Sequence, residues 1–276
     1  MFRAMDTDPR DSPPPRVERF FEVLLARDGA GGSWLGPLLR AAPRGRARFG
    51  ELVDHPGWIE APIAVLTETG RRGAFEYPAA PARELLGWFI DHAEQLRRPD
   101  GERATPEALR LRRALIDDDP PGMRARAQDR AHELLRRSVP LGDVWWRFED
   151  AHTADCLLMT DRLVLLVQAR DEGTAPAPAT PWFPQRTALA RDLEAAQRFG
   201  ADGKAWGVLV LGAPGESGGE SDGGGESEGR EALAEELAAG APHLDAEGRR
   251  ELAAGYLGAL TWSQAAASTG VETATI

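Results

Sequence analysis

The chain has 276 residues, of which 42% are hydrophobic and 28% are charged, and its formal net charge is −11. This length and apolar content exclude a wholly disordered chain and suffice for a buried core. The single cysteine, Cys156, excludes a disulfide scaffold and a thiolate zinc cluster, and it predicts a reducing, cytoplasmic environment. No apolar run is long enough for a membrane span or a signal peptide, so we expect no membrane association.

The negative charge is concentrated in the C-terminal quarter. Residues 1–120 carry 18 basic and 20 acidic side chains, residues 121–206 carry 12 of each, and residues 207–276 carry 3 basic and 12 acidic ones. This distribution excludes a basic surface over the whole chain, of the kind that many nucleic-acid-binding proteins carry. A local basic groove in the neutral middle segment is compatible with it.

The N-terminal part of the chain is expected to be mainly helical. Residues 1–15 predict a disordered leader, and residues 16–120 predict a helical region to which we assign no chemistry. Thr105 is a typical N-cap, and Pro106 after it is typical of a first helical position. Residues 60–78 fit neither a helical nor a strand pattern.

From Pro120 onward the pattern alternates between helix and strand. The predicted order is αβββαβ, followed by a flexible Gly/Ser/Glu loop at 214–229 and C-terminal helices at 230–276 that pack on the core. We therefore expect an α/β (α+β) fold. The expected elements are a helix at 122–138, strands at 144–150, 154–161 and 162–170, a helix at 184–199, a strand at 204–212, and helices at 230–239, 245–260 and 262–268.

The hairpin at 154–170 carries a polar cluster. It is symmetric about the step from Asp161 to Arg162, and in the simplest register Asp155 lies opposite Gln168. Side chains alternate between the faces of a strand, so Asp155, Gln168 and Arg170 share one face. Because the middle of the second strand is apolar on both faces, we expect it to be a central strand. Polar groups that converge on a buried strand need partners or a function.

This arrangement resembles the PD-(D/E)XK nuclease superfamily, with an αβββαβ core, an acid at the start of the second strand and a polar-x-basic triplet ending the third. The resemblance covers residues 122–212, within an expected nuclease-like core at 121–213. It implies that Asp155, Gln168 and Glu133 hold Mg²⁺ or Mn²⁺ and that Arg170 takes the place of the motif lysine. It also implies a restriction-endonuclease-like fold, a nucleic-acid substrate and phosphodiester hydrolysis by a metal-activated water.

Three positions depart from the superfamily motif. Gln168 offers a neutral carbonyl oxygen where the motif has a carboxylate, and Mg²⁺ prefers charged oxygen ligands. Arg170 keeps the positive charge of the motif lysine, but it cannot lose a proton at ordinary pH and its planar fork places its donors differently. Ala154 stands where the motif has proline. Since Lys204 is the only lysine in the chain, an arginine at position 170 also agrees with the overall composition.

Each candidate residue also has a structural interpretation. Asp155 could bond to a turn, Gln168 and Arg170 could mark where the strand emerges into solvent, and Glu133 could be a solvated helix residue. Asp161 is expected to be a turn residue. Further alternatives are Glu149 or Asp150 as the motif acid, Trp182 and Phe183 as core aromatics or as a base-stacking pair, and Arg186 and Arg191 as phosphate ligands or as solvated helix charges.

Three hypotheses of function follow. The first is a metal-dependent nuclease, and the second is a catalytically inactive PD-(D/E)XK-fold binding or assembly module, which the substitutions at 168 and 170 favour. The third is a mainly helical interaction protein in which the hairpin is only structural. The positions of Asp155, Gln168, Arg170 and Glu133 in the fold bear on all three.

Overall fold

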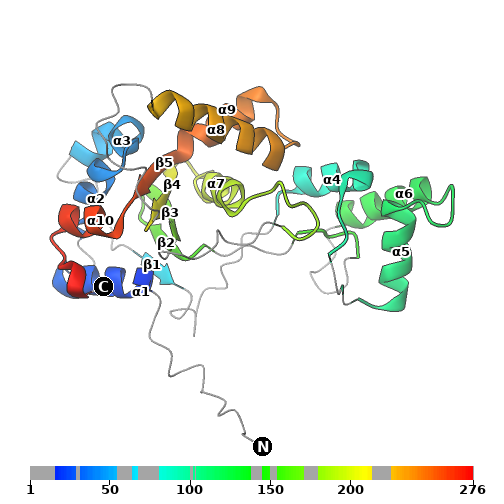
Figure 1. Cartoon of the computed structure of the whole chain (residues 1–276), viewed down its shortest axis with the longest axis horizontal. Coiled ribbons are helices and arrows are strands. Elements are labelled where there is room, and N and C mark those ends of the chain that lie inside the picture. The colour runs from blue at the N-terminus through cyan, green and yellow to red at the C-terminus, as the bar shows by residue number, and fades with distance from the viewer. Residues whose placement is uncertain are drawn as a thin grey trace, which may run out of the picture.

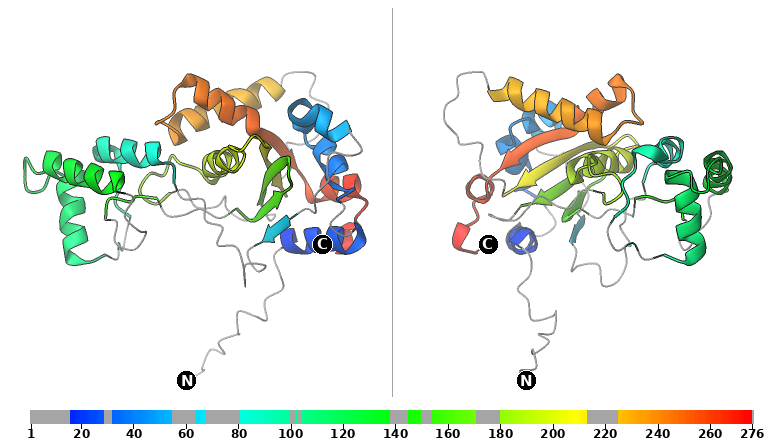
Figure 2. Two further views of the ribbon diagram at one scale, coloured as in Figure 1. Left: turned by 180° about the vertical axis from the view of Figure 1, so that it is seen from behind. Right: turned by 45° about the vertical axis from the view of Figure 1, so that its right-hand side comes forward.

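The computed structural model shows a mixed α/β protein in two lobes (Figure 1). One lobe is built on a sheet, and the other consists of helices α4, α5 and α6. The second view in Figure 2 shows the helical lobe standing to one side of the sheet. The structure describes residues 16–28, 32–54, 64–67, 81–99, 102, 104–137, 145–149, 154–170, 180–212 and 225–275.

A five-stranded mixed sheet with strand order β1-β2-β3-β4-β5 forms the centre of the first lobe. β1 pairs antiparallel with β2 and β2 with β3, whereas β3 pairs parallel with β4 and β4 with β5. Cys156 lies opposite Val167 and Met159 opposite Val164, which confirms the register expected for the hairpin. The strands are β1 (Ala64–Thr67), β2 (Cys156–Met159), β3 (Leu163–Ala169), β4 (Ala205–Leu211) and β5 (Tyr256–Leu260).

Helices cover both faces of the sheet. The face that carries Leu157, Val164 and Leu166 packs against α7 (Ala188–Phe199), α8 (Gly225–Gly240) and α9 (Ala246–Gly255). The opposite face, with Leu158 and Leu165, packs against the N-terminal helices and α10. Because β3 is buried on both faces, it is the central strand that its apolar run predicts. The helices on this second face are α1 (Arg16–Asp28), α2 (Leu35–Ala41), α3 (Gly45–Asp54) and α10 (Trp262–Thr269), which the short helix η5 (Thr273–Thr275) follows.

The helical lobe has an aromatic core of its own. Phe89 from α4 packs edge to face on Phe148 and Phe183, with ring centroids 6.5 and 5.6 Å apart. Trp145 and Trp146 lie in the same cluster. The lobe contains α4 (Arg83–Asp91), the short helix η4 (Ala93–Gln95), α5 (Pro106–Ile116) and α6 (Arg124–Arg136).

The strand expected at 144–150 is wrong for its described residues. Residues 145–149 form a turn, a bend and irregular chain with no sheet partner, because their aromatic side chains pack on helices instead of alternating across a sheet. The first strand of the sheet is Ala64–Thr67, from a segment that fits no pattern. The boundary expected at residue 120 does not match the packing either. α1 to α3 belong to the sheet lobe, whereas α6 packs with α4 and α5.

The C-terminal part differs from the expectation in three respects. α8 begins at Gly225, inside the expected loop at 214–229, of which residues 214–224 lie outside the described part. The helix expected at 245–260 ends at Gly255 and continues as β5, where Gly258 has φ 98°, a conformation that no helix contains. α10 covers the face of the sheet opposite α8 and α9. The expected leader at 1–15 lies outside the described residues.

Phe148 tests the aromatic core of the helical lobe. Its side chain is 1% exposed and lies 5.1 Å from Trp182, centroid to centroid. We expect Phe148→Ala to lower the free energy of unfolding by about 3–5 kcal/mol, because it opens a cavity, and Phe148→Leu to cost less than about 2 kcal/mol. Urea denaturation measures both. A loss below about 1 kcal/mol for Phe148→Ala would contradict this packing.

Candidate functional site

Asp155 and Gln168 meet at one end of the sheet. Asp155 directly precedes β2 and Gln168 is the second-last residue of β3, and the register that pairs Cys156 with Val167 places them opposite each other. The backbone N–H of Ala169 donates a hydrogen bond to Asp155 Oδ2 at 2.7 Å. This is the carboxyl end of β3, from which the chain crosses to α7 and returns in the parallel strand β4. The structure thus brings two of the predicted site residues together.

Gln168 is a buried polar residue with an unsatisfied oxygen. Its side chain is 4% exposed, and Oε1 is buried with no hydrogen-bond partner among the described residues. Leaving a buried acceptor without a donor costs about 1–3 kcal/mol. Arg170 follows at the end of the same strand, where its N–H donates to Leu211 O at 2.7 Å and its Nε is buried without a partner in the described part. These unused groups favour a ligand at this end over strand residues that merely emerge into solvent.

Glu133, by contrast, is not part of this arrangement. It lies on α6, which packs against α4 and α5 in the helical lobe and not against the sheet (Figure 2). Arg130 and Arg137 each donate to its carboxylate at 2.6 Å. The hydrogen bond from Arg130 and the charge of Arg137 hold the pKa of Glu133 below its usual value. The expectation that Glu133 joins Asp155 is corrected, because the helix that carries it does not adjoin the sheet.

A different carboxylate lies nearer to the start of β2. Glu18, on α1, is 2% exposed. Burial raises the pKa of the Cys156 thiol, and the charges of Asp155 and Glu18 raise it further, so both carboxylates lie within electrostatic range of this residue. The sequence analysis missed Glu18, since a single acid in the first turn of an amphipathic helix is also typical of a solvated or dipole-stabilising residue.

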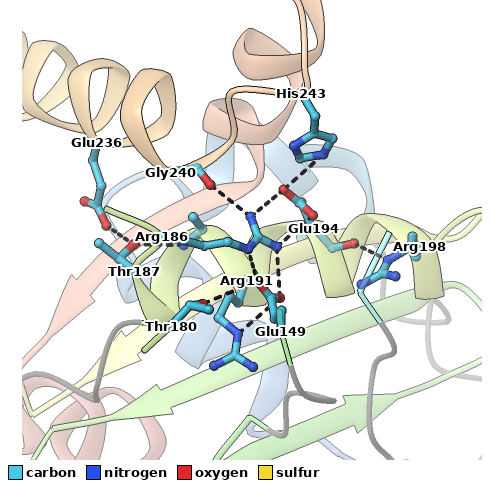
Figure 3. Close-up of polar contacts among 11 residues, drawn as sticks. Glu149, Thr180, Arg186, Thr187, Arg191, Glu194, Arg198, Glu236, Gly240 and His243 are labelled. Carbon is cyan, nitrogen blue, oxygen red and sulfur yellow. Dashed lines mark hydrogen bonds and ion pairs between the residues drawn. The ribbon is translucent and has the colours of Figure 1, made fainter. Parts of the chain in front are cut away.

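A second group of buried polar residues surrounds a guanidinium beside α7 (Figure 3). Arg186 is 1% exposed, and two buried glutamates surround it. Its Nη1 and Nη2 donate to Glu194 at 2.8 and 2.9 Å, and its Nε donates to Glu149. Nη1 also donates to the carbonyl of Gly240 at 3.0 Å. The guanidinium therefore connects the segment before β2, the interior of α7 and the end of α8.

Local sequence places each member of this cluster. Thr187 caps α7 by accepting a hydrogen bond from Ala190 N at 3.2 Å, so Arg186 directly precedes the helix and Glu194 lies in its second turn. A Cβ on Gly240 would lie 3.0 Å from Gln185 O, so glycine allows the end of α8 to approach closely. Burial alone would lower the pKa of Arg186, but the charges of Glu194 and Glu149 and their hydrogen bonds outweigh burial and raise this pKa above its ordinary value.

An arginine and a histidine also border the cluster. Arg191 Nε lies 3.4 Å from Glu149 Oε1, and His243 Nε2 lies 3.5 Å from Glu194 Oε1. The His243 side chain is only 3% exposed. Burial lowers the pKa of His243, and the positive charge of Arg186 adds to this effect although Glu194 opposes it. His243 is therefore favoured in its neutral form inside the fold.

These contacts decide several of the alternatives. Arg186 is neither a phosphate ligand nor a solvated helix charge, and Glu149 binds arginines rather than serving as the acid of the hairpin motif. Trp182 and Phe183 are core aromatics of the helical lobe. Asp161 is exposed in the turn between β2 and β3, as expected.

Three comparisons with known proteins found no match to this chain. No protein-family model, curated protein or solved structure matches the chain. Within the described residues, no three His, Cys, Asp or Glu side chains form a group that could hold a metal ion, and no helix is long and apolar enough to cross a membrane.

The buried ion pairs predict a large effect of removing Arg186. We expect Arg186→Leu to lower the free energy of unfolding by about 3–5 kcal/mol, because Glu149 and Glu194 would stay buried without a counter-charge. The control is Arg46→Leu on α3, where an arginine that is 74% exposed lies 3.5 Å from Asp54, and where less than about 1 kcal/mol is expected. Equal losses in urea denaturation would show that the cluster adds nothing beyond a surface pair.

The low pKa of His243 predicts a pH-dependent stability. Below the ordinary value of 6.5 the unfolded chain binds a proton that the folded chain does not, so stability falls with pH from there to the lower pKa of the folded state. The slope is at most about 1.4 kcal/mol per pH unit. The free energy of unfolding of the natural protein should fall more than that of His243→Gln between about pH 7.5 and about pH 5.5. Parallel curves would contradict the burial of a neutral imidazole.

Proposed function

We propose that this chain is a metal-dependent nuclease of the PD-(D/E)XK type, which hydrolyses phosphodiester bonds of nucleic acid. One observation carries the proposal: Asp155 and the unsatisfied oxygen-bearing side chain of Gln168 are paired across the β2–β3 hairpin, and Arg170 follows two residues later. A polar group buried at this cost is common at functional sites. No other described feature of the sheet places a carboxylate, a free acceptor and a guanidinium at one strand end.

The surrounding topology supports the proposal. Three successive antiparallel strands, then α7, then a parallel strand follow the order βββαβ, and α1 precedes them as the helix on the opposite face. The restriction-endonuclease-like core that we propose therefore starts with α1 and β1 instead of residues 122–138 and 144–150. The helical lobe, α4 to α6, is an insertion between β1 and β2 in this description.

The residues present fit a magnesium or manganese ion. Mg²⁺ in phosphoryl-transfer sites is bound by one or two carboxylates together with substrate phosphates and water, so a full protein cage is not required. Asp155 would supply a charged oxygen and Gln168 Oε1 a neutral one. When bound, such an ion polarises the phosphate and makes water a better nucleophile.

The protein's own groups have separate roles in this proposal. The hydrogen bond from Ala169 N orients the Asp155 carboxylate at the end of the hairpin. Arg170 would hold a non-bridging phosphate oxygen through its guanidinium fork, and it cannot act as a base because it stays protonated. Proton removal from the attacking water therefore does not depend on Arg170.

The test is cleavage of labelled single- and double-stranded DNA and RNA with Mg²⁺, with Mn²⁺ and with EDTA. We expect metal-dependent cleavage that falls by about a hundredfold or more in Asp155→Ala, since removing a ligand weakens both metal affinity and activity. Asp161→Ala, which removes an exposed acid from the tip of the same hairpin, is the matched control and should cleave like the natural protein. Activity that survives unchanged in Asp155→Ala would contradict the proposal.

A second candidate is a catalytically inactive binding or assembly module with the same fold. Gln168 and Arg170 favour it, because a neutral oxygen binds Mg²⁺ more weakly than a carboxylate and arginine departs from the motif lysine. In the same assay this candidate predicts no cleavage by the natural protein, and cleavage by Gln168→Glu/Arg170→Lys. Metal-dependent turnover by the natural protein would exclude it.

A further inference from the structure

An arginine row lies on the outer helix of the helical lobe. α6 and the residue that follows it bear five arginines and two carboxylates, although the chain as a whole has a net charge of −11. Ala127 and Ala131 are the buried residues of this helix. The arginine row is defined here as Arg126, Arg130, Arg136 and Arg137, which together with Asp129 and Glu133 line a surface hollow of about 780 Å³.

Much of the positive charge in this row has no counter-charge. Glu133 accepts hydrogen bonds from both Arg130 and Arg137, so one carboxylate serves two guanidiniums. Arg136 donates through Nε to a backbone carbonyl, that of His132, at 3.3 Å. Within the described part of the chain, no carboxylate forms an ion pair with Arg126 or Arg136. The low pKa of Glu133 agrees with a surplus of positive charge around it.

The length of the arginine row matches a stretch of phosphate backbone. Positions 126, 130 and 137 follow one stripe of the helix, and the rise from 126 to 137 is about 16 Å. A strand of duplex carries one phosphate per ~3.4 Å of axis, so this length matches about four or five phosphates. Guanidinium forks bind phosphate oxygens in pairs, which makes arginine the usual residue for such contacts.

The helical lobe is tied to the sheet lobe through the Arg186 cluster. Phe148 belongs to the aromatic core of the lobe and Glu149, the next residue, binds Arg186. Phe183 belongs to the same core, and Arg186 follows three residues later at the start of α7. A strand held on the lobe would therefore lie on a body that is anchored to the helix following β3.

We propose that the arginine row on α6 binds the phosphate backbone of the nucleic acid on which this chain acts. The inference rests on the proposed function, because it assigns the substrate-holding surface of that nuclease. Such contacts bind sequence-independently and weaken with salt. Glu133 is then a spacer that holds two of the arginines in line, and not a metal ligand.

The experiment measures binding apart from cleavage. Fluorescence anisotropy of a labelled DNA duplex and of its single strand is titrated with the full chain in EDTA, at several salt concentrations. The variant is Arg126→Gln/Arg136→Gln. Its control, Arg46→Gln/Arg250→Gln, removes the same charge from two exposed arginines on α3 and α9 in the sheet lobe. Thermal unfolding confirms that both variants remain folded.

We expect the row variant to raise Kd about tenfold and to lower the slope of log K against log salt by about two, one for each lost phosphate contact. The control should bind like the natural protein. Equal binding by the row variant, or no binding of nucleic acid by the natural protein, would overturn the inference. Equally tight and row-dependent binding of poly-glutamate would also overturn it, in favour of an acidic protein partner.

The cleavage and binding experiments distinguish failure of the proposed nuclease from failure of the proposed phosphate-binding row. Cleavage that depends on Asp155, together with unchanged binding by the row variant, would contradict only the proposed role of the arginine row. Row-dependent binding by a chain that cleaves nothing with any metal would remove only the nuclease, and would leave the arginine row as the surface of a binding module.

Discussion

A buried guanidinium at the junction of the two lobes is the constraint on which the structure depends. Arg186 is withdrawn from water at a cost of several kcal/mol, which only well-placed carboxylates can offset. Glu149 and Glu194 supply them from the segment before β2 and from α7. Any shift of one element against the other would leave a charge buried alone, so this cluster fixes the position of α7 relative to the hairpin segment.

The Arg186 cluster also links the helical lobe to the sheet lobe. Glu149 is bound six residues before Asp155, and Arg186 is bound at the start of the helix that follows β3. Both chain segments that lead from the aromatic core of the helical lobe toward the sheet are thus held to each other. The lobe that carries the arginine row is thereby fixed to the helix that follows β3.

Charge has opposite roles in the two lobes. In the Arg186 cluster, arginines and glutamates are buried and matched, so they specify geometry. On α6, exposed arginines outnumber the acids, and in water such charges contribute little to stability but attract polyanions. Arginine therefore binds carboxylates inside the fold at position 186, and we propose that it binds phosphates at positions 126 and 136.

The sequence predicted the elements whose pattern is local. The hairpin register followed from its symmetry, and Thr105 caps a helix as predicted. β1 was missed because it has only four residues, and β5 because Tyr256–Leu260 continues a helical pattern. The aromatic run at 144–150 is typical of a strand, and only the tertiary contacts with α4 show where its rings pack.

The candidate site was predictable to a similar extent. Alternation along two adjacent strands is enough to pair Asp155 with Gln168, whereas the position of Glu133 depends on how α6 packs in space. Arg186 and Glu194 could not be recognised, since charged residues near the start of a helix are usually solvated. Their burial is decided by Glu149, which lies far away in the sequence.

The central claim is that the β2–β3 end of the sheet is a metal site. Anomalous diffraction from crystals soaked in Mn²⁺ tests it most directly, because it locates the ion without requiring turnover. We expect an anomalous peak within coordination distance of an Asp155 carboxylate oxygen and of Gln168 Oε1, and loss of that peak in Asp155→Ala. Bound manganese elsewhere on the chain, with none between these two side chains, would contradict it.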